Sequence, residues 1–336
     1  MSKLRVSLAL SRNPNTAPLI SGHVGVEGLD VHVTTVHPSE MFWRQLKFAD
    51  FDISEMSMST LLILTAAAQD SGVVRDWVAI PVFTSRRFFH TGGLVRTDSG
   101  IEKPRDLVGK RVGVPEYQQT AAVWTRGILH EQFGVDPRDV HWHMERVPEI
   151  SHAGSTGFTP PSGITITQIQ RGESIASKLD DGSLDATIMY INDPNIVDRS
   201  RTDLSRHPMV RPLFADVEAE CRRYHRATGL FPVNHAVVVR RELAEQHPWI
   251  VLNVYQAFVN ARDAARAPVL EALGDYVATG AIDEAARAAL VENLYPYGIK
   301  ANRGELDTLC RYAFEQGLTG HLLTPEDVFD QRTHAL

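Results

Sequence analysis

The sequence is poor in cysteine and has no long apolar run. Its two cysteines, Cys221 and Cys310, form neither a disulfide framework nor the closely spaced pairs of a zinc site, so we expect two reduced thiols. The most apolar stretch, Leu61–Ala68, is far shorter than the roughly 20 residues that a membrane-spanning helix needs. We expect no membrane segment, and we interpret this stretch as part of a buried helix.

Positive charge is also scarce. Lys and Arg number 34 against 41 Asp and Glu, which gives a net charge of −7. Nucleic-acid-binding surfaces are usually basic, so no nucleic-acid partner is expected. The first residues lack the apolar core of a secretory leader, and Leu4–Leu10 has the pattern of a first strand. The expectation that follows is a cytoplasmic location.

Several sequence motifs of well-known catalytic sites are missing. No Gly-x-Gly-x-x-Gly follows a strand, and there is no Walker A sequence, no His-Glu-x-x-His and no Gly-x-Ser-x-Gly. The pair His141-x-His143 lies on one strand face without an obvious third ligand, so we interpret it as a solvated face. The sequence predicts no metal site and no required cofactor.

What the sequence does contain is an alternation of strand-like and helix-like segments over 336 residues, 43% of them hydrophobic. This alternation is typical of α/β proteins with largely parallel sheets, and the length predicts about two domains. Expected strands are 4–10, 29–36, 51–54, 77–83, 111–114, 140–144, 184–190 and 236–240. Expected helices are 16–21, 38–48, 57–68, 118–133, 172–181, 241–259, 261–276, 282–294, 303–317 and 325–329, and 152–163 is expected to be a loop.

The two expected domains share one internal similarity. Leu46–Ile53 and Leu179–Ala186 each combine a helix end, a small residue and a hydrophobic-Asp pair that opens a strand. Duplication of an α/β lobe explains this pattern, and chance similarity is the alternative. We expect a first lobe formed by residues 1–92 together with 236–336, which include the C-terminal helices, and a second lobe formed by residues 93–235.

Polar side chains cluster where the expected strands end. In open α/β sheets, ligands bind at the carboxyl ends of the strands, and helix N-termini that follow them favour anions. The candidates for substrate binding are Arg12, Ser57, Ser59, Arg86, Glu116, Tyr117, Gln118 and Asp193, and the candidates for proton transfer at these strand ends are Glu55 and His90. Each also has a structural interpretation: Ser57 and Ser59 as helix caps, Arg86 as a surface charge, and the histidine and glutamates as satisfied polar groups.

The sequence resembles the 4,5-dihydroxyphthalate decarboxylase family over nearly its whole length. The resemblance rests on Ser54-Glu55-Met56-Ser57, Ile80–Phe83 with Ser85-Arg86 and His90, Gly109–Gln118, Trp124 with Arg126-Gly127, Phe231-Pro232 with His235, and Pro296-Tyr297-Gly298 with Asn302. It implies a two-lobe fold like that of type II periplasmic binding proteins, with the ligand in the cleft between the lobes. By the same comparison, Glu55, Arg86, His90, Glu116, Tyr117 and His235 match positions that face the cleft. The chain departs from the family near Arg12–Asn15, at Arg87–Phe89, at Gln119 and over Glu145–Gly163.

The resemblance also implies a reaction: loss of CO₂, without oxidation, from a hydroxylated aromatic acid, with conversion of 4,5-dihydroxyphthalate to 3,4-dihydroxybenzoate as the first expectation. Such an enzyme needs a cation for the remaining carboxylate, a base for the phenol and an acid for the ring carbon. Arg86 is the expected cation, and Glu55, His90 and His235 share the other roles. A divalent ion is left open, as is a homo-oligomer. The alternative function is a non-catalytic solute-binding protein for a small organic anion.

Overall fold

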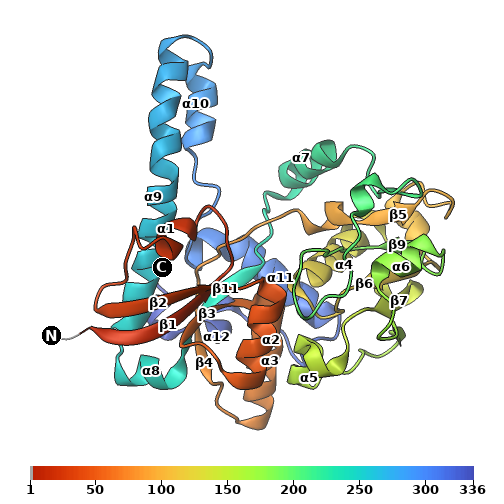
Figure 1. Cartoon of the computed structure of the whole chain (residues 1–336), viewed down its shortest axis with the longest axis horizontal. Coiled ribbons are helices and arrows are strands. Elements are labelled where there is room, and N and C mark those ends of the chain that lie inside the picture. The colour runs from red at the N-terminus through yellow and green to blue at the C-terminus, as the bar shows by residue number, and fades with distance from the viewer. Residues whose placement is uncertain (1–2) are drawn as a thin grey trace.

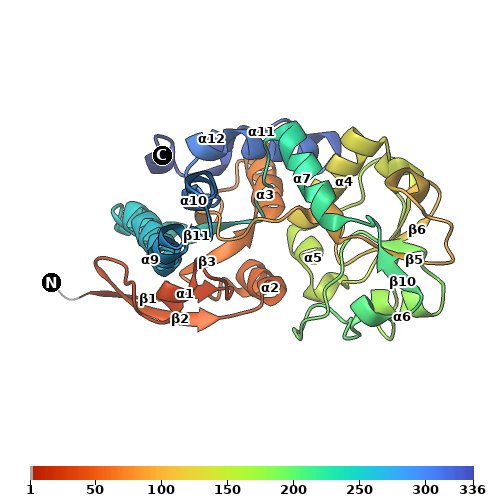
Figure 2. The ribbon, with the colours of Figure 1, turned by 90° about the horizontal axis from the view of Figure 1, so that it is seen from above.

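Two lobes lie side by side in the computed structural model, which describes residues 3–336 (Figures 1 and 2). The first lobe is built on a five-stranded sheet with the order β2-β1-β3-β11-β4. β1 pairs in parallel with β2 and β3, whereas β11 is antiparallel to β3 and β4. Its strands and early helices are β1 (Leu4–Leu10), α1 (Ala17–Ile20), β2 (Leu29–Thr35), α2 (Pro38–Phe48), β3 (Ile53–Ser57), α3 (Met58–Ser71), β4 (Trp77–Ile80) and β11 (His235–Arg240).

The second lobe is built on a six-stranded sheet with the order β10-β5-β9-β6-β7-β8. β6 is parallel to β7 and β9, and β5 is antiparallel to β9 and β10. Its elements are β5 (Leu94–Arg96), β6 (Arg111–Val114), α4 (Thr120–Phe133), β7 (His141–Met144), α5 (His152–Thr156), β8 (Ile166–Gln168), α6 (Ile175–Asp180), β9 (Ala186–Thr187), β10 (Val210–Pro212) and α7 (Val217–Thr228). The 3₁₀ turns of the chain are η1 (Phe89–Gly92), η2 (Pro104–Leu107), η3 (Pro137–Asp139), η4 (Pro148–Ile150), η5 (Leu204–Arg206), η6 (Lys300–Asn302) and η7 (Gln331–Thr333).

The C-terminal helices return to the first lobe. They are α8 (Arg241–Gln246), α9 (Ile250–Ala278), α10 (Glu284–Val291), α11 (Arg303–Glu315) and α12 (Pro325–Val328). The outer part of α9 and α10 form a hairpin that projects from the body (Figure 1). Apolar side chains remain exposed on it, among them Val269, Tyr276 and Leu290. Whether this hairpin joins two copies of the chain stays a prediction.

Local sequence signals explain where the main helices begin and end. Pro38 occupies the first turn of α2, where its missing N–H costs nothing, and the His37 ring accepts a hydrogen bond from the Ser39 N–H at 3.3 Å. α3 and α4 end at Gly72 and Gly134, whose φ angles of 71° and 65° lie in the left-handed region that glycine adopts without strain. These helices follow the predicted ranges closely.

Several predicted elements differ from the structure. Residues 241–276 were predicted as two helices separated near Asn260, but the break falls at His247–Trp249, and α9 continues through Pro268. The predicted loop 152–163 begins with α5, because the Ser151 hydroxyl caps it by accepting from the Gly154 N–H at 2.9 Å. The predicted strand 184–190 is reduced to β9, and α7 was not predicted.

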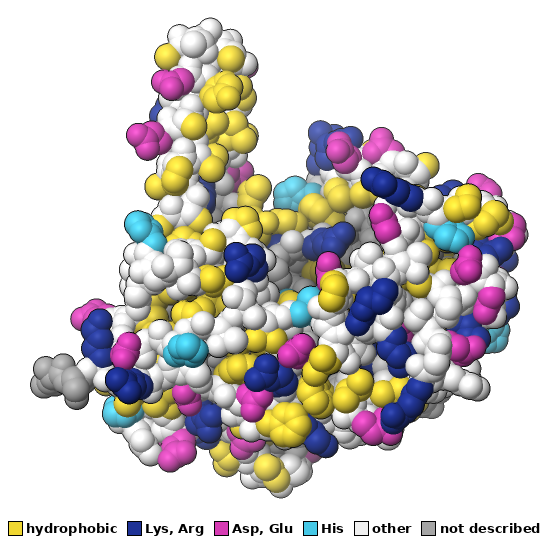
Figure 3. Space-filling view, viewed as in Figure 1, with side chains coloured by type: hydrophobic (Ala, Val, Ile, Leu, Met, Phe, Trp, Pro, Cys, Tyr) yellow, Lys and Arg dark blue, Asp and Glu magenta, His cyan; other side chains and the backbone are white. Residues whose placement is uncertain are grey.

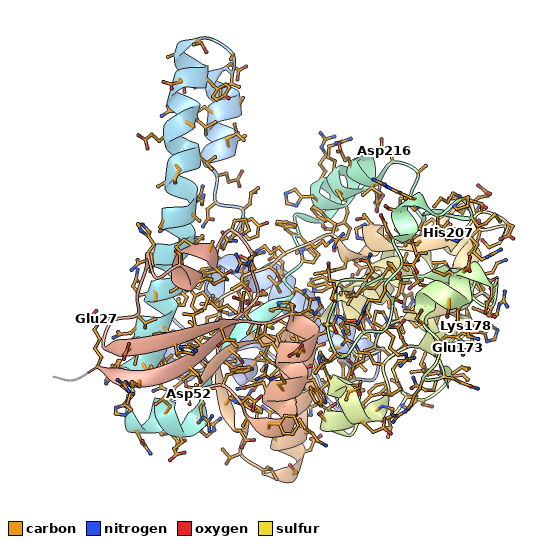
Figure 4. The ribbon with its side chains drawn as sticks, in the orientation of Figure 1. Glu27, Asp52, Glu173, Lys178, His207 and Asp216 are labelled. Carbon is orange, nitrogen blue, oxygen red and sulfur yellow. The ribbon has the colours of Figure 1, made fainter. Side chains whose placement is uncertain are left out.

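The internal similarity has a structural counterpart. Asp52, just before β3, accepts a hydrogen bond from the Ser7 N–H of β1 at 2.9 Å. Asp185, just before β9, accepts one from the Arg111 N–H of β6 at 2.8 Å. In both lobes the aspartate therefore fixes the start of one strand against its parallel neighbour. Figure 4 shows Asp52 near the lower edge of the first lobe, remote from the second lobe.

α4 joins the two lobes although it follows β6 of the second. Ala121, Val123, Trp124 and Ile128 pack into the core of the first lobe, whereas Ala122 and Leu129 pack into the core of the second. The Trp124 indole N–H also donates to the Val233 carbonyl at 2.9 Å, close to the start of β11. This helix therefore fixes the lobes relative to each other beside the cleft.

Candidate functional site

A buried carboxylate lies in the middle of the first sheet. Glu55 is on β3, a strand buried along its whole length between β1 and β11, where a charged residue is unusual. Its carboxylate accepts hydrogen bonds from the Ser11 N–H at 2.8 Å, the Ser11 hydroxyl at 2.7 Å and the Thr84 hydroxyl at 2.8 Å. These donors follow β1 and β4, and Glu55 itself belongs to β3, so residues from three strands meet at this carboxylate.

His235 completes this group. It is the first residue of β11 and lies opposite Ser57 in the antiparallel register. Its Nδ1 is 2.9 Å from Glu55 Oε2, and its ring meets the Phe42 ring edge-on at 4.7 Å between centroids. The Asn234 amide nitrogen lies 2.8 Å from His235 Nε2. Because an amide NH₂ can only donate, Nε2 accepts, and Nδ1–H donates to Glu55.

The surroundings keep Glu55 ionised. Burial raises the pKa of Glu55, but hydrogen bonds from His235 and Ser11 lower it further than burial raises it, so the pKa lies below its ordinary value. The Glu55 carboxylate therefore fixes the His235 ring with Nδ1–H toward Glu55 and Nε2 toward Asn234.

A cluster of hydroxyl groups connects the lobes next to this pair. The hydroxyls of Ser57 and Thr120 are 2.7 Å apart, and the Thr120 hydroxyl accepts from the Ser59 N–H at 2.9 Å. The Ser59 hydroxyl donates to the carbonyl oxygen of Gln118 at 2.5 Å. Ser57 and Ser59 thus bind the second lobe at the N-termini of α3 and α4, and the Gln118 side chain donates to Thr156 at 3.0 Å.

A cavity of about 270 Å³ lies between the lobes beside His235. The first lobe and the segments that connect the two lobes contribute Ser85, Arg87 and Asn234 to its lining. The second lobe contributes Ile188–Tyr190. The Ser85 hydroxyl is 3.5 Å from His235 Nδ1. Arg87 is exposed, and within residues 3–336 its guanidinium has no hydrogen-bond or ion-pair partner. Figure 3 shows the surface hollowed between the two lobes.

A second buried carboxylate is held in a different way. Glu116 follows β6, and its Oε2 is 2.7 Å from Arg146 Nη1. Arg146 also donates to Asp198 Oδ1 at 2.7 Å and, across to α2 of the first lobe, to the Ser39 hydroxyl at 2.6 Å. His152 Nε2 is 3.0 Å from the Ser39 carbonyl oxygen, a second link between the lobes. Asp198 and Glu116 keep the pKa of Arg146 above its ordinary value although burial lowers it.

The structure brings together only some of the predicted site residues. Glu55, His235, Ser57 and Ser59 lie together, whereas His90 lies elsewhere, buried against α7 with its Nε2 3.0 Å from Glu220 Oε1. Tyr117 is buried under Arg126, in a different cavity. Arg12 and Asp193 are exposed, and Arg12 directly follows Ser11.

Arg86, the predicted carboxylate ligand, lines the cavity between the lobes, and its terminal nitrogens are hydrogen-bonded within the protein. Its guanidinium donates to the carbonyl oxygens of Phe231 at 2.9 Å and Pro296 at 3.0 Å, and to the Asn302 side chain. Glu305 of α11 lies 3.4 Å away. Both terminal nitrogens therefore bind the loop and helix of the C-terminal region. Glu116 is likewise neutralised by Arg146.

Sequence reasoning missed several members of these groups. Ser11, Thr84 and Asn234 hydrogen-bond to the Glu55–His235 pair, and each adjoins a residue or strand end that the sequence marked. Arg146 and Asp198 gave no local signal, because their partners are distant in the sequence. In residues 3–336 no group of three or more metal-type side chains lies together. No helix in the same range is long and apolar enough to span a membrane.

Comparison with known proteins places this geometry in context. Residues 76–152 match the family model described as NMT1/THI5 like. The chain is 33% identical to the 4,5-dihydroxyphthalate decarboxylase of Comamonas testosteroni over 332 residues, which cover 98% of this chain and 97% of the relative. It is 34% identical to the protein of the same name from Pseudomonas putida over 227 residues, covering 68% of this chain and 83% of that relative.

Solved structures with low sequence identity show the fold. The aliphatic sulphonate binding protein SsuA of Escherichia coli superposes with a TM-score of 0.54 at 14% identity over 100% of both chains. The desulfurization enzyme DszB superposes with a TM-score of 0.55 at 16% identity over 98% of each chain. The predicted two-lobe, periplasmic-binding-protein-like α/β fold is confirmed.

Proposed function

Because the chain belongs to the 4,5-dihydroxyphthalate decarboxylase family, we propose that it is a decarboxylase that converts 4,5-dihydroxyphthalate to 3,4-dihydroxybenzoate and CO₂. The observation that carries the proposal is the buried Glu55–His235 pair, whose histidine contacts Ser85 and Asn234 of the interlobe cavity lining. A binding protein needs no proton donor there. A decarboxylase does, because the departing carboxylate must be replaced by a proton.

The reaction consumes one proton per turnover. The substrate dianion takes up a proton at the ring carbon that bears the leaving carboxylate, with electron density supplied by the hydroxyl para to that carbon. The bond to the carboxylate then breaks, its electron pair returns to the ring, and CO₂ leaves. The product is the monoanion of 3,4-dihydroxybenzoate, so charge and atoms balance without an oxidant or reductant.

His235 supplies this proton in our proposal. Its Nδ1–H is fixed by Glu55, so Nε2 is the nitrogen that can face a substrate once the Asn234 amide is displaced. Glu55 holds Nδ1–H in place, so a proton taken up from solvent after each turnover is carried on Nε2. Glu55 acts through His235, as a positioning residue, and His235 is the catalytic acid.

Arg87 binds the remaining carboxylate in our proposal. It lines the cavity with an unpaired guanidinium, whereas the neighbouring Arg86 has acceptors on both terminal nitrogens. A guanidinium can bind a carboxylate through two parallel hydrogen bonds, which fixes the ring as well as the charge. The cavity of about 270 Å³ is close to the lower end of the range for ligand pockets, roughly 300–1,000 Å³.

The experiment that tests this function follows CO₂ release and product mass after incubation of the purified protein with 4,5-dihydroxyphthalate and with a panel of hydroxybenzoates, with and without chelator. Release of one CO₂ per 3,4-dihydroxybenzoate formed supports the proposal, and chelator sensitivity decides whether a divalent ion takes part. Turnover of a different acid keeps the chemistry but changes the substrate. Binding without turnover across the panel contradicts the proposal and favours a solute-binding protein.

The two adjacent arginines provide a matched test of carboxylate binding. We expect Arg87→Gln to raise KM about tenfold or more, since hydrogen bonds to charged groups contribute about 1.5–3 kcal/mol, while the unfolding midpoint stays unchanged. Arg86→Gln should instead lower the unfolding midpoint, because it removes bonds to Pro296 and Asn302. An unchanged KM in Arg87→Gln would show that Arg87 does not bind the substrate carboxylate.

A further inference from the structure

A second and larger cavity, of about 490 Å³, lies apart from the proposed active site. It is bounded by α4 and the segments 136–138 and 161–164 of the second lobe, and by α11 and the residues after it. None of its lining residues lines the cavity beside His235. Figure 2 shows α4 and α11 next to each other along one side of the molecule. The proposed reaction makes no use of this space.

Arg126 of α4 lines this cavity with an unsatisfied guanidinium. The residue is 1% exposed, and only its Nε–H is bonded, to the Gln316 side chain at 2.9 Å. Within residues 3–336 both terminal nitrogens lack an acceptor, although they are buried. Leaving a buried cation without an acceptor is costly, so such groups are normally paired. Burial lowers the pKa of Arg126, in keeping with a missing counter-ion.

Like Arg126, Tyr117 lines this cavity and has a buried polar group without a hydrogen-bond partner among the described residues. Its ring lies against the Arg126 guanidinium, whose central carbon is 3.6 Å from the ring centroid. This stacking stabilises the cation through the ring face but leaves the N–H edges free. The Tyr117 hydroxyl is also buried without a partner in the described chain. Two side chains whose hydrogen-bond donors have no acceptor among the described residues therefore lie together at one cavity. Both belong to segments that carry the family resemblance.

The other charged groups of the cavity already have partners. Arg138 pairs with Asp136 at 2.5 Å, and Arg311 pairs with Glu131 at 2.9 Å and with Glu315 at 3.2 Å. Arg126 is thus the one lining arginine of the described chain without an ion pair. The three carboxylates around it disfavour a second negative charge on a ligand, because like charges repel at short range. Pro137, Pro161 and Ile164 provide apolar surface for the body of a ligand.

We propose that this cavity binds a small aromatic monocarboxylate, with its carboxylate held by the terminal nitrogens of Arg126 and the Tyr117 hydroxyl. A carboxylate matches the two parallel donors of a guanidinium edge, and an aromatic ring fits the apolar lining. A dicarboxylate is disfavoured by the neighbouring acidic groups. The product of the proposed reaction is a monocarboxylate of this kind, but the binding site stands on the contacts of Arg126 alone and does not require that reaction.

The test uses benzoate as the probe and Arg87→Gln as the parent protein, so that binding in the interlobe cavity is weakened. Isothermal titration should detect one benzoate site in the parent. Adding Arg126→Gln should weaken that site at least about tenfold, whereas the matched control Arg138→Gln, which alters an exposed and already paired arginine of the same cavity, should leave it within about twofold.

Two further measurements keep the proposal falsifiable if Arg126→Gln fails to fold. Ser162→Trp places a large side chain at an exposed residue of the cavity lining and leaves Arg126 intact, and it should also abolish benzoate binding.

Benzamide, which has the shape of benzoate without the charge, and phthalate, which has two charges, should each bind at least about tenfold more weakly than benzoate. Equal binding of benzoate in the parent and in Ser162→Trp would overturn the site. Equal binding of benzamide would overturn the role of the charge. Because each readout is binding, a failure of the decarboxylase proposal would not affect the result.

Discussion

Glu55 and Glu116 are buried glutamates of the two lobes, and both are 0% exposed. Glu55 is the central residue of β3, and Glu116 lies just beyond the carboxyl end of β6. Their partners differ. Glu55 accepts hydrogen bonds from two hydroxyls, one N–H and His235. Glu116 pairs with Arg146, which also holds Asp198, and it accepts from the Ala153 N–H, while His152 Nδ1 lies 3.5 Å away.

This difference separates a group that can move a proton from a group that holds the structure together. Arginine stays protonated at any ordinary pH, and Asp198 and Glu116 keep the pKa of Arg146 high even though it is buried. Arg146 therefore has one charge state. Histidine changes charge near neutral pH, so the Glu55–His235 pair has two states and can deliver a proton.

The largest expected effect is on turnover. His235→Asn removes the proposed proton donor and should lower kcat about 10²–10⁴-fold, the usual contribution of general acid catalysis, while 4,5-dihydroxyphthalate still binds. Steady-state kinetics together with equilibrium binding measure both quantities. His90→Asn is the matched control, since His90 faces Glu220 and α7, and its turnover should remain within a few-fold of wild type. A loss of turnover confined to His90→Asn would reverse the assignment of the proton donor.

A second prediction concerns Glu55 itself. Glu55→Gln leaves His235 without its carboxylate partner, so kcat should fall. The alkaline limb of the pH–rate profile, where an acid catalyst loses its proton, should move to lower pH, because positive charge on the ring is no longer stabilised. Asp52→Asn is the control at the opposite end of the same strand, where Asp52 binds Ser7 of β1. It should reduce stability without moving the profile. An unshifted profile in Glu55→Gln would show that Glu55 does not act through His235.

The corresponding change in the second lobe should affect stability. Glu116→Gln removes one of the two carboxylates on the buried Arg146, and breaking a buried ion pair costs roughly 3–5 kcal/mol. The expected result in urea unfolding is a lower midpoint, with kcat per folded molecule unchanged. Asp185→Asn, which weakens the more exposed Arg111 pair of the same lobe, should cost less. If Glu116→Gln lost turnover with its stability intact, the contrast between the two glutamates would be wrong.

The sequence predicted this contrast only in part. Strand and helix alternation and the polar residues after strands identified Glu55 and Glu116 as candidates, because these signals are local, and the family resemblance added His235. The partners that decide their roles are distant in sequence: His235 is 180 residues from Glu55, and Asp198 is 52 residues from Arg146. Arg86 was predicted as a ligand because its residue type suits carboxylates, but its neighbours Pro296 and Asn302 come from the far end of the chain. Residue type alone cannot show which arginine is already paired.

Glu220 has both a histidine and an arginine within hydrogen-bond distance of its carboxylate. His90 Nε2 is 3.0 Å from its carboxylate, and Arg223 donates to it at 2.7 Å. Burial raises the pKa of Glu220, but the hydrogen bonds from Arg223 and His90 lower it further, to about 2 from an ordinary value of 4.5. The folded state therefore binds this proton less readily than the unfolded state. The resulting stability is fully present above pH 4.5 and is lost as the pH falls toward about 2.

Glu220→Gln should remove this part of the pH dependence, and it is the smallest effect that we expect. Unfolding free energies measured in urea should differ most between Glu220→Gln and wild type above pH 4.5 and should converge as the pH approaches about 2. Glu218→Gln is the matched control on α7, because that carboxylate is exposed and pairs only with Arg222. Its difference from wild type should stay small at every pH. A constant gap between Glu220→Gln and wild type down to the lowest pH would mean that the lost stability is packing and not charge, and Glu220 would then belong with the purely structural contacts of His90.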